Sequence, residues 1–250
     1  MKNGSVVDYS VAEVDSVVFV KKTVTDPPVD PNPIVSGAVK VTEYGGWFES
    51  GYAEWTLLDG ADSYNVYYKL ATSSSYTQAD EMLVRSYGSY ARVDVLGLKA
   101  GTYDLKIVPV VSGKEAGDPT VVSFIAQAYD RAGFAHFNNA GVGANDDGTL
   151  KSDAVVIYLT EKNKSTLVQD VQTSATSSTS CTGISAVLSA LQKGYETRPF
   201  CIRLVGTITA SGVTGSGDAN NMLLKASNDS RPVKNVTIEG VGDDATCYGF

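Results

Sequence analysis

Residues 235–250 read Asn235-Val-Thr-Ile-Glu-Gly-Val-Gly-Asp-Asp-Ala-Thr-Cys-Tyr-Gly-Phe250, and the interpretation of the whole chain starts from them. Val236 and Ile238 alternate with polar residues, which predicts a short strand with one buried face. Gly240 and Gly242 follow, and we expect the backbone to turn tightly there because glycine tolerates unusual dihedral angles.

Two similar segments precede this strand, at 201–208 and 222–226, and each is followed by Gly, Ser or Asn. Short strands joined by turns without helices are typical of a coil of parallel rungs. Such a coil needs at least three rungs and a cap over its open end. Because the third rung lies at the end of the chain, we expect the sequence to be the truncated front part of a longer protein.

A short amphipathic helix is expected just before the first rung, because four apolar residues share one helical face: Ile184, Val187, Leu188 and Leu191. Ser180 or Thr182 is expected to cap its start, and Gly194 to end it in the left-handed conformation. We expect this helix to cover the open end of the coil, which is a capping role.

The composition restricts the possible partners. The chain has 250 residues and a net charge of -8, which argues against nucleic acid, whose phosphates are bound by clustered Lys and Arg. An anionic ligand would be repelled unless a cation or a local basic patch intervened. The sequence has no apolar run long enough to span a bilayer and no signal-peptide core.

Few residues are suited to metal binding. The only histidine is His136, and the three cysteines, Cys181, Cys201 and Cys247, lack the spacing of a zinc site. We therefore predict no structural metal site, buried free thiols, and a packed or surface position for His136.

Three parts are predicted along the chain. Residues 1–35 hold a strand segment and the proline-rich spacer Asp26-Pro-Pro-Val-Asp-Pro-Asn-Pro33. Residues 36–128 are expected to form a β-sandwich, and residues 129–250 the start of the coil. The sandwich strands are expected at 51–57, 64–69, 91–98, 102–110 and 121–125.

Two segments of the predicted sandwich resemble a fibronectin type III domain. Trp55 precedes Gly60-Ala-Asp-Ser-Tyr-Asn-Val-Tyr-Tyr68, and Leu96-Gly-Leu-Lys-Ala-Gly-Thr-Tyr103 follows. The resemblance implies that Trp55 lies in the core on the second strand. It also implies that Tyr103 forms the corner that ties down the sixth strand.

Trp47 is the candidate for carbohydrate binding. It lies in Tyr44-Gly-Gly-Trp-Phe48, which we expect to be a Gly-rich turn. An exposed ring there would stack on a sugar, whereas packing in the core or docking against the next domain would bury it. The sequence favours packing or docking over sugar binding and leaves both open.

The connection after the sandwich contains Asp147-Gly148 between two apolar runs, which predicts a hairpin. Its acidic residues do not form an EF-hand, because Gly143 and Ala154 occupy the first and last ligand positions. Residues 161–180 are rich in Ser and Thr and are expected to form a loop.

The second half of the chain resembles the opening of a pectate lyase of polysaccharide lyase family 1. The resemblance rests on Arg203-Leu-Val-Gly-Thr-Ile208 and on Asn235-Val-Thr-Ile-Glu-Gly-Val-Gly242, which are similar to the first rungs of that family. The chain resembles in particular the secreted gut-bacterial members that carry an N-terminal fibronectin type III module. The implied fold is all-β: a sandwich, a capping helix, and the first rungs of a right-handed parallel β-helix.

The family resemblance implies calcium-dependent β-elimination on polygalacturonate, with an arginine as the base. In the family these calcium ligands and this arginine lie on later rungs, so no catalytic residue and no metal ligand is assigned within this chain. Four charged residues are instead interpreted as turn acids or a solvated face residue: Asp218, Asp243, Asp244 and Arg203.

The sequence thus predicts the N-terminal part of a secreted or cell-surface pectate lyase. We expect a monomer that acts on acidic plant polysaccharide, and we expect these residues alone to be inactive. The alternative is a non-catalytic carbohydrate-binding or spacer module.

Overall fold

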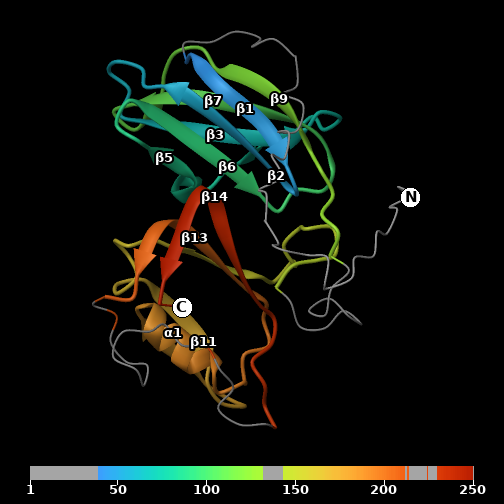
Figure 1. Cartoon of the computed structure of the whole chain (residues 1–250), viewed down its shortest axis with the longest axis vertical. Coiled ribbons are helices and arrows are strands. Elements are labelled where there is room, and N and C mark those ends of the chain that lie inside the picture. Colours follow the sequence, from blue (N-terminus) through green and yellow to red (C-terminus); the bar gives the residue numbers. More distant parts are fainter. Residues whose placement is uncertain (1–38, 132–142, 212, 214–223, 225–229, 250) are drawn as a thin grey trace, which may run out of the picture.

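The computed structural model describes residues 39–131, 143–211, 213, 224 and 230–249. A β-sandwich packs on one side of a small parallel sheet, and a helix lies on the side of that sheet away from the sandwich (Figure 1). Several predictions fall outside the described residues: those for 1–35, His136, Asp218 and nearly all of 222–226.

One sheet of the sandwich is antiparallel and has the order β1-β2-β6-β5. Its strands are β1 (Val41–Trp47), β2 (Ser50–Thr56), β5 (Val84–Ser86) and β6 (Tyr90–Leu96). A 3₁₀ turn, η2 (Glu81–Leu83), leads into β5, with Asp80 as its N-cap.

The facing sheet is built on β7 (Gly101–Val111), which pairs with β3 (Ser63–Leu70) on one side and β9 (Thr120–Ala126) on the other. Two short strands extend it, β4 (Thr77–Gln78) and β8 (Lys114–Glu115). This pairing is that of a fibronectin type III sandwich, so the predicted sandwich and its main strands are confirmed.

The aromatic core of the sandwich also agrees with the prediction. Trp55 is fully buried and meets Tyr64 edge to face, with ring centroids 5.2 Å apart. Tyr103 is buried, stacks on Phe124 and hydrogen-bonds the backbone of Lys99, four residues upstream. Tyr103 therefore forms the expected corner.

The prediction of a turn at 44–48 is wrong, because residues 44–47 belong to β1 and the chain turns only after them. A Cβ atom on Gly46 would lie 1.8 Å from the carbonyl oxygen of Ile125, so glycine lets β1 pack directly against the β9 backbone. The chain then pairs with the end of β9, where the Gln127 N–H donates to the Trp47 carbonyl (2.9 Å). Gly46 thus allows close packing of strands β1 and β9 and does not form a turn.

The small sheet is parallel and has the order β10-β13-β14. Its strands are β10 (Val155–Leu159), β13 (Phe200–Thr209) and β14 (Val236–Tyr248). The strands predicted at 201–208 and 235–242 are thus confirmed as parallel neighbours, and β10 is the third member. The described residues show this one small sheet and no β-helical coil.

Two turn predictions in this region need correction. Gly240 does not end the last strand, because β14 continues to Tyr248. The strand is instead kinked at Gly242 (φ 74°), where its register with β13 shifts. The tight turn at 145–149 exists, with Gly148 at φ 82°, and an isolated antiparallel bridge between Ala144 and Leu150 closes it. The predicted hairpin is limited to this bridge, because the following strand β10 pairs with β13.

The predicted helix is confirmed as α1 (Ile184–Leu191), and Gly194 is left-handed (φ 68°) as expected. Its N-cap is Gly183, without a side-chain cap, because Thr182 and Ser180 belong to a strand. That strand, β12 (Ser178–Thr182), pairs with β11 (Val168–Gln172) where a loop was predicted. Only one residue of each is buried, Cys181 and Val171, so no alternating pattern marks the hairpin.

The helix and the parallel sheet share one apolar cluster, formed by residues such as Ile184, Leu188, Leu159, Phe200 and Ile202. The opposite side of the sheet contributes Val205 and Val241 to the core of the sandwich. The two parts of the molecule are therefore joined by buried apolar contacts and not by a linker alone.

Two further findings concern the described residues as a set. All three cysteines are free, with Cys181 and Cys201 buried and Cys247 half-buried. No helix among the described residues is long and apolar enough to cross a bilayer.

Candidate functional site

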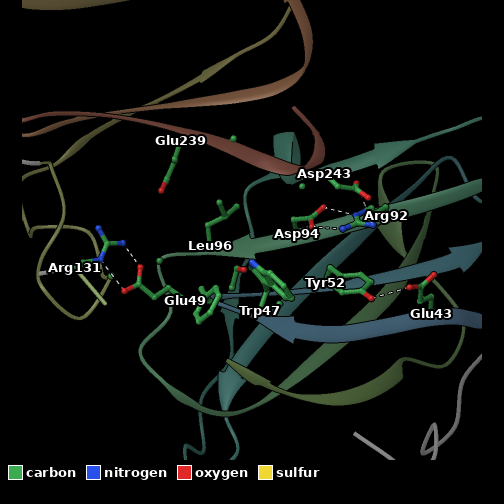
Figure 2. A pocket seen from close by; sticks show the side chains of 17 residues that line it. Glu43, Trp47, Glu49, Tyr52, Arg92, Asp94, Leu96, Arg131, Glu239 and Asp243 are labelled. Carbon is green, nitrogen blue, oxygen red and sulfur yellow. Dashed lines mark hydrogen bonds and ion pairs between the residues drawn. The ribbon is translucent and has the colours of Figure 1, made fainter. Parts of the chain in front are cut away.

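A cleft of about 600 Å³, which we call the junction cleft, lies where the sandwich meets β14. Strands β1, β2 and β6 form one wall, the segment around Arg131 another, and β14 the third (Figure 2). Its lining combines aromatic rings, carboxylates and guanidinium groups, so it offers a ligand both apolar and polar contacts.

The aromatic side of the cleft consists of Trp47, Phe48 and Tyr52. Trp47 is 39% exposed and Phe48 41% exposed, and their rings meet edge to face at 5.3 Å. Phe48 makes a similar contact with Tyr129 at 5.6 Å. Trp47 is thus neither in the core nor covered by another element, and its ring faces the cleft (Figure 2).

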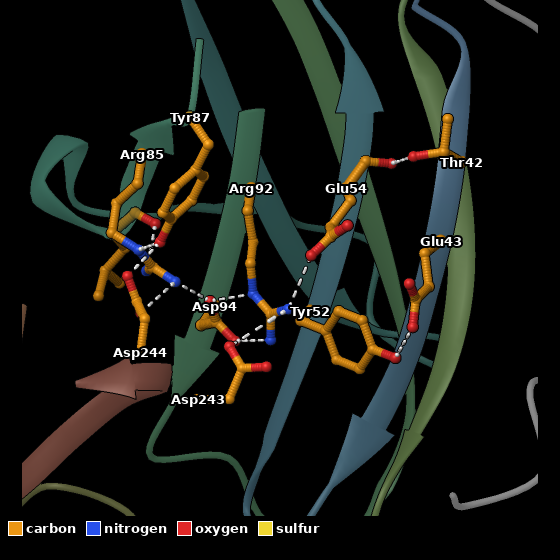
Figure 3. Close-up of polar contacts among 11 residues, drawn as sticks. Thr42, Glu43, Tyr52, Glu54, Arg85, Tyr87, Arg92, Asp94, Asp243 and Asp244 are labelled. Atoms are coloured by element: carbon orange, nitrogen blue, oxygen red, sulfur yellow. Dashed lines mark hydrogen bonds and ion pairs between the residues drawn. The ribbon is translucent and has the colours of Figure 1, made fainter. Parts of the chain in front are cut away.

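Arg92 is held in place by two carboxylates and one ring (Figure 3). Its Nε and Nη2 atoms donate to Asp94 at 2.9 Å each, and Nη1 donates to Glu54 at 2.8 Å. The guanidinium carbon lies 4.4 Å from the ring centroid of Tyr52. Burial would lower the pKa of Arg92, but the hydrogen bonds and charge of Asp94, the hydrogen bond to Glu54 and the charge of Asp243 raise it above its usual value.

A second polar cluster joins the sandwich to the kink of β14. Arg85 pairs with Asp94, and the Tyr87 hydroxyl donates to Asp244 at 2.6 Å (Figure 3). Arg85 Nη2 also lies 3.8 Å from Asp244. Asp243 extends from the same kink, 85% exposed, with a carboxylate oxygen 3.7 Å from Arg92 Nη1. The two aspartates, expected to be simple turn acids, therefore contact the sandwich.

At the opposite end of the cleft Arg131 pairs with Glu49, whose Oε1 accepts from Arg131 Nε at 2.9 Å. The hydrogen bond and charge of Glu49 raise the pKa of Arg131. Glu49 is only 8% exposed and closely contacts Gly148, where a Cβ atom would lie 2.2 Å from the Glu49 carboxyl carbon. The tight turn at Gly148 is thus needed to seat this ion pair.

The wall formed by β14 carries Glu239, whose side chain extends from the parallel sheet into the cleft (Figure 2). Its Oε1 accepts from Arg203 Nε at 2.7 Å and from the Cys201 thiol at 3.1 Å. Burial, reinforced by the charge of Glu239, raises the pKa of Cys201 to about 12.

The prediction that Arg203 is a solvated face residue is wrong. Only 4% of Arg203 is exposed, because β13 places it between the parallel sheet and the sandwich. Besides Glu239, it donates to the Tyr158 hydroxyl at 3.1 Å. Its Nη2 atom is buried without a hydrogen-bond partner among the described residues.

The arrangement is suited to binding a polar ligand with an apolar face. Arg92 and Arg131 already pair with carboxylates, whereas Glu43, Glu239 and Asp243 keep acceptor positions toward the cleft. Among the residues described, no three His, Cys, Asp or Glu side chains gather closely enough to hold a metal ion. This part of the chain therefore does not fit a calcium site, and we assign it no metal-dependent step.

The sequence indicated only Trp47 of this site. Tyr52, Glu54, Arg92 and Asp94 were missed, although they alternate with buried residues on β2 and β6. In the register of these strands Glu54 lies opposite Arg92, and Tyr52 opposite Asp94. The alternation was therefore a usable signal for a charged outer face of the sheet, but the register was needed to bring these groups together.

No protein-family model and no curated protein sequence matches the chain. Among solved structures, an Fn3-like protein from Clostridium thermocellum is similar, with 19% identity and a TM-score of 0.27, over 37% of this chain and 94% of that one. The fibronectin type-III domain of human fibronectin type III domain containing protein 3 is 15% identical, with a TM-score of 0.28, over 41% and 94% of the two chains.

The fn3 domain of human contactin 1 is also similar, at 14% identity and a TM-score of 0.26, over 50% of this chain and 98% of that domain. All three scores are below 0.5. The strand pairing described above is therefore the basis for the fibronectin type III-like fold.

Proposed function

We propose that this chain is the front part of a secreted lyase that degrades pectin, and that its own contribution is to bind the polysaccharide in the junction cleft. The observation that carries the binding role is the cleft itself, with the half-exposed Trp47 on one wall and carboxylates on the others. Sugar rings present an apolar face that packs on an aromatic ring and hydroxyl groups that donate to carboxylates.

Support for the lyase comes from the sequence resemblance of 203–208 and 235–242 to the first rungs of a pectate lyase. The same segments pair in parallel within β13 and β14, which is compatible with the start of a parallel β-helix. The resemblance also implies a calcium-dependent β-elimination. No residue of this chain is assigned to that chemistry, and the chain alone is proposed to be inactive.

The close packing of the sandwich against the parallel sheet supports separate roles for the two, with ligand binding at their contact and catalysis elsewhere in the lyase. Val205 and Val241 pack into the core of the sandwich, and Asp244 bonds Tyr87 across the same contact. A ligand held between the sandwich and β14 would thus be held in a fixed position relative to the parallel sheet. Fixed positioning of a polymer is what a neighbouring catalytic site requires.

The second candidate is a carbohydrate-binding module without any lyase partner. It is favoured by the extent of the parallel sheet, because the described residues form three parallel strands and no β-helical coil. Both candidates share the binding cleft and differ only in turnover.

The binding test is retention of the chain in gels that contain pectin. Trp47→Ala is expected to weaken binding about tenfold or more, because truncating a central aromatic contact typically costs that much. The matched control is Tyr248→Ala, which removes an aromatic that is 62% exposed but does not line the cleft. Equal retention of the wild type and Trp47→Ala would remove the binding role.

The turnover test follows ultraviolet absorbance of unsaturated uronate from polygalacturonate, with calcium and with a chelator. We expect no product from this chain in either condition. A chelator-sensitive signal would contradict the proposal that the chain alone is inactive.

A further inference from the structure

We infer that the junction cleft selects uncharged sugar units, such as methyl-esterified galacturonate, over free uronates. This inference rests on the proposed function, because it takes pectin to be the ligand. It concerns the specificity of the cleft and not the chemistry of any lyase site.

The charge of the cleft is the first argument. Five carboxylates line it against two guanidinium groups, which leaves an excess of three negative charges. The carboxylates belong to Glu43, Glu49, Asp94, Glu239 and Asp243. Counting the charged groups that contact this set does not change the balance, since Arg85 and Arg203 are matched by Glu54 and Asp244.

The second argument is that both arginines lining the cleft already have carboxylate partners. Arg92 donates three hydrogen bonds to Asp94 and Glu54, and Arg131 is held by Glu49. A uronate would have to displace one of these partners to gain a contact with either guanidinium group that lines the cleft. Removing one partner of such a partly buried ion pair leaves a charge without compensation, which is strongly unfavourable.

The remaining acceptors are the third argument. Glu239 uses only Oε1 for the contacts with Arg203 and Cys201, and Glu43 uses only Oε1 for the Tyr52 hydroxyl. Carboxylate oxygens accept hydrogen bonds from sugar hydroxyls but offer nothing to another carboxylate. Together with the ring of Trp47, they favour a hydroxyl-rich unit without its own charge.

The size of the discrimination follows from Coulomb's law. At an effective dielectric constant of about 40, between the values for a protein surface and for bulk water, binding of a uronate about 6 Å from one uncompensated negative charge is weakened roughly tenfold. Esterification removes that charge and leaves the sugar ring and its secondary hydroxyls unchanged. We therefore expect esterified units to bind at least tenfold more tightly than free ones.

The test compares oligogalacturonides of one length, fully methyl-esterified and fully de-esterified, by calorimetric titration of the chain in a chelator-containing buffer. Glu43→Gln and Asp243→Asn each remove a charge from an accessible wall and retain an acceptor oxygen. Each is expected to narrow the preference for the esterified form severalfold, because each removes the repulsion of a free uronate while both forms lose the same acceptor oxygen for sugar hydroxyls. Asp59→Asn, at an exposed turn acid that does not line the cleft, is expected to change neither.

The outcomes separate this inference from the proposal beneath it. If both forms bind equally and both depend on Trp47, the inference fails and the proposed binding function stands. If neither form binds, the proposed function fails with it. A preference for the esterified form that Glu43→Gln and Asp243→Asn leave unchanged would overturn the electrostatic explanation.

Discussion

Gly242 at the kink of β14 offers the sharpest perturbation of the junction. Its φ of 74° lies in the left-handed region, and a Cβ atom there would lie 2.6 Å from Arg85 Nη2 and 3.0 Å from an Asp94 oxygen. Gly242→Ala therefore introduces two separate costs. One is backbone strain, and the other is a collision with the ion pair on which the kink lies.

The two costs have different magnitudes. An alanine in the left-handed region costs about 1 kcal/mol. The collision must move Arg85 away from Asp94, and each side chain is only 9% exposed. Hydrogen bonds to charged groups contribute about 1.5–3 kcal/mol. We therefore expect Gly242→Ala to lower the free energy of unfolding by about 2.5–4 kcal/mol.

Gly113→Ala is the matched control, because Gly113 has the same φ of 74° and no atom within 4 Å of the added Cβ. Gly113→Ala should lower the free energy of unfolding only through the backbone strain, by about 1 kcal/mol. The loss of unfolded-chain entropy on changing Gly to Ala is the same for both variants and cancels. The assay is urea unfolding at 25 °C, followed by emission of the buried Trp55. If the two variants lose the same stability, the close seating of β14 on the Arg85–Asp94 pair is refuted.

Two further predictions concern ionisable groups. Burial would raise the pKa of Glu196, but hydrogen bonds from Arg198 and from the Gln172 N–H lower it from 4.5 to about 2. Ionised Glu196 thus contributes about 3 kcal/mol above pH 4.5, lost as the pH falls toward 2. Urea unfolding of Glu196→Gln should show that deficit at pH 7 and almost none near pH 2, and a constant deficit would contradict this. Iodoacetamide at pH 8 should modify native Cys247 before Cys201, whose pKa is about 12, and equal rates would contradict the burial of Cys201.

Much of the fold was predictable because its signals are local. Alternation identified the long sandwich strands, and the apolar face of residues 184–191 identified the helix. The turn predicted at 44–48 failed because Gly45 and Gly46 were interpreted by conformational freedom, whereas Gly46 is needed for contact with Ile125. That contact joins residues about eighty positions apart, which no local pattern encodes.

The site was less predictable because it is assembled from distant segments. Trp47 was identified from its residue type, but Glu49 and Arg131 pair across 82 positions of sequence, and Glu239 joins them only when β14 packs against the sandwich. Arg203 was misassigned for the same reason, since its place between two packed parts depends on the tertiary contact. Charged residues on strands are ordinarily solvated, so the residue type alone predicted exposure for Arg203, which is buried.

The central claim is that the junction cleft binds pectin beside Trp47. The most direct measurement is a titration of the chain with methyl-esterified oligogalacturonide, followed by tryptophan emission. The chain has two tryptophans, and Trp55 is fully buried in the sandwich core, so a ligand in the cleft should change the emission of Trp47 alone. We predict a saturable change that Trp47→Ala abolishes. No change in the wild type, or the same change in Trp47→Ala, would contradict the claim.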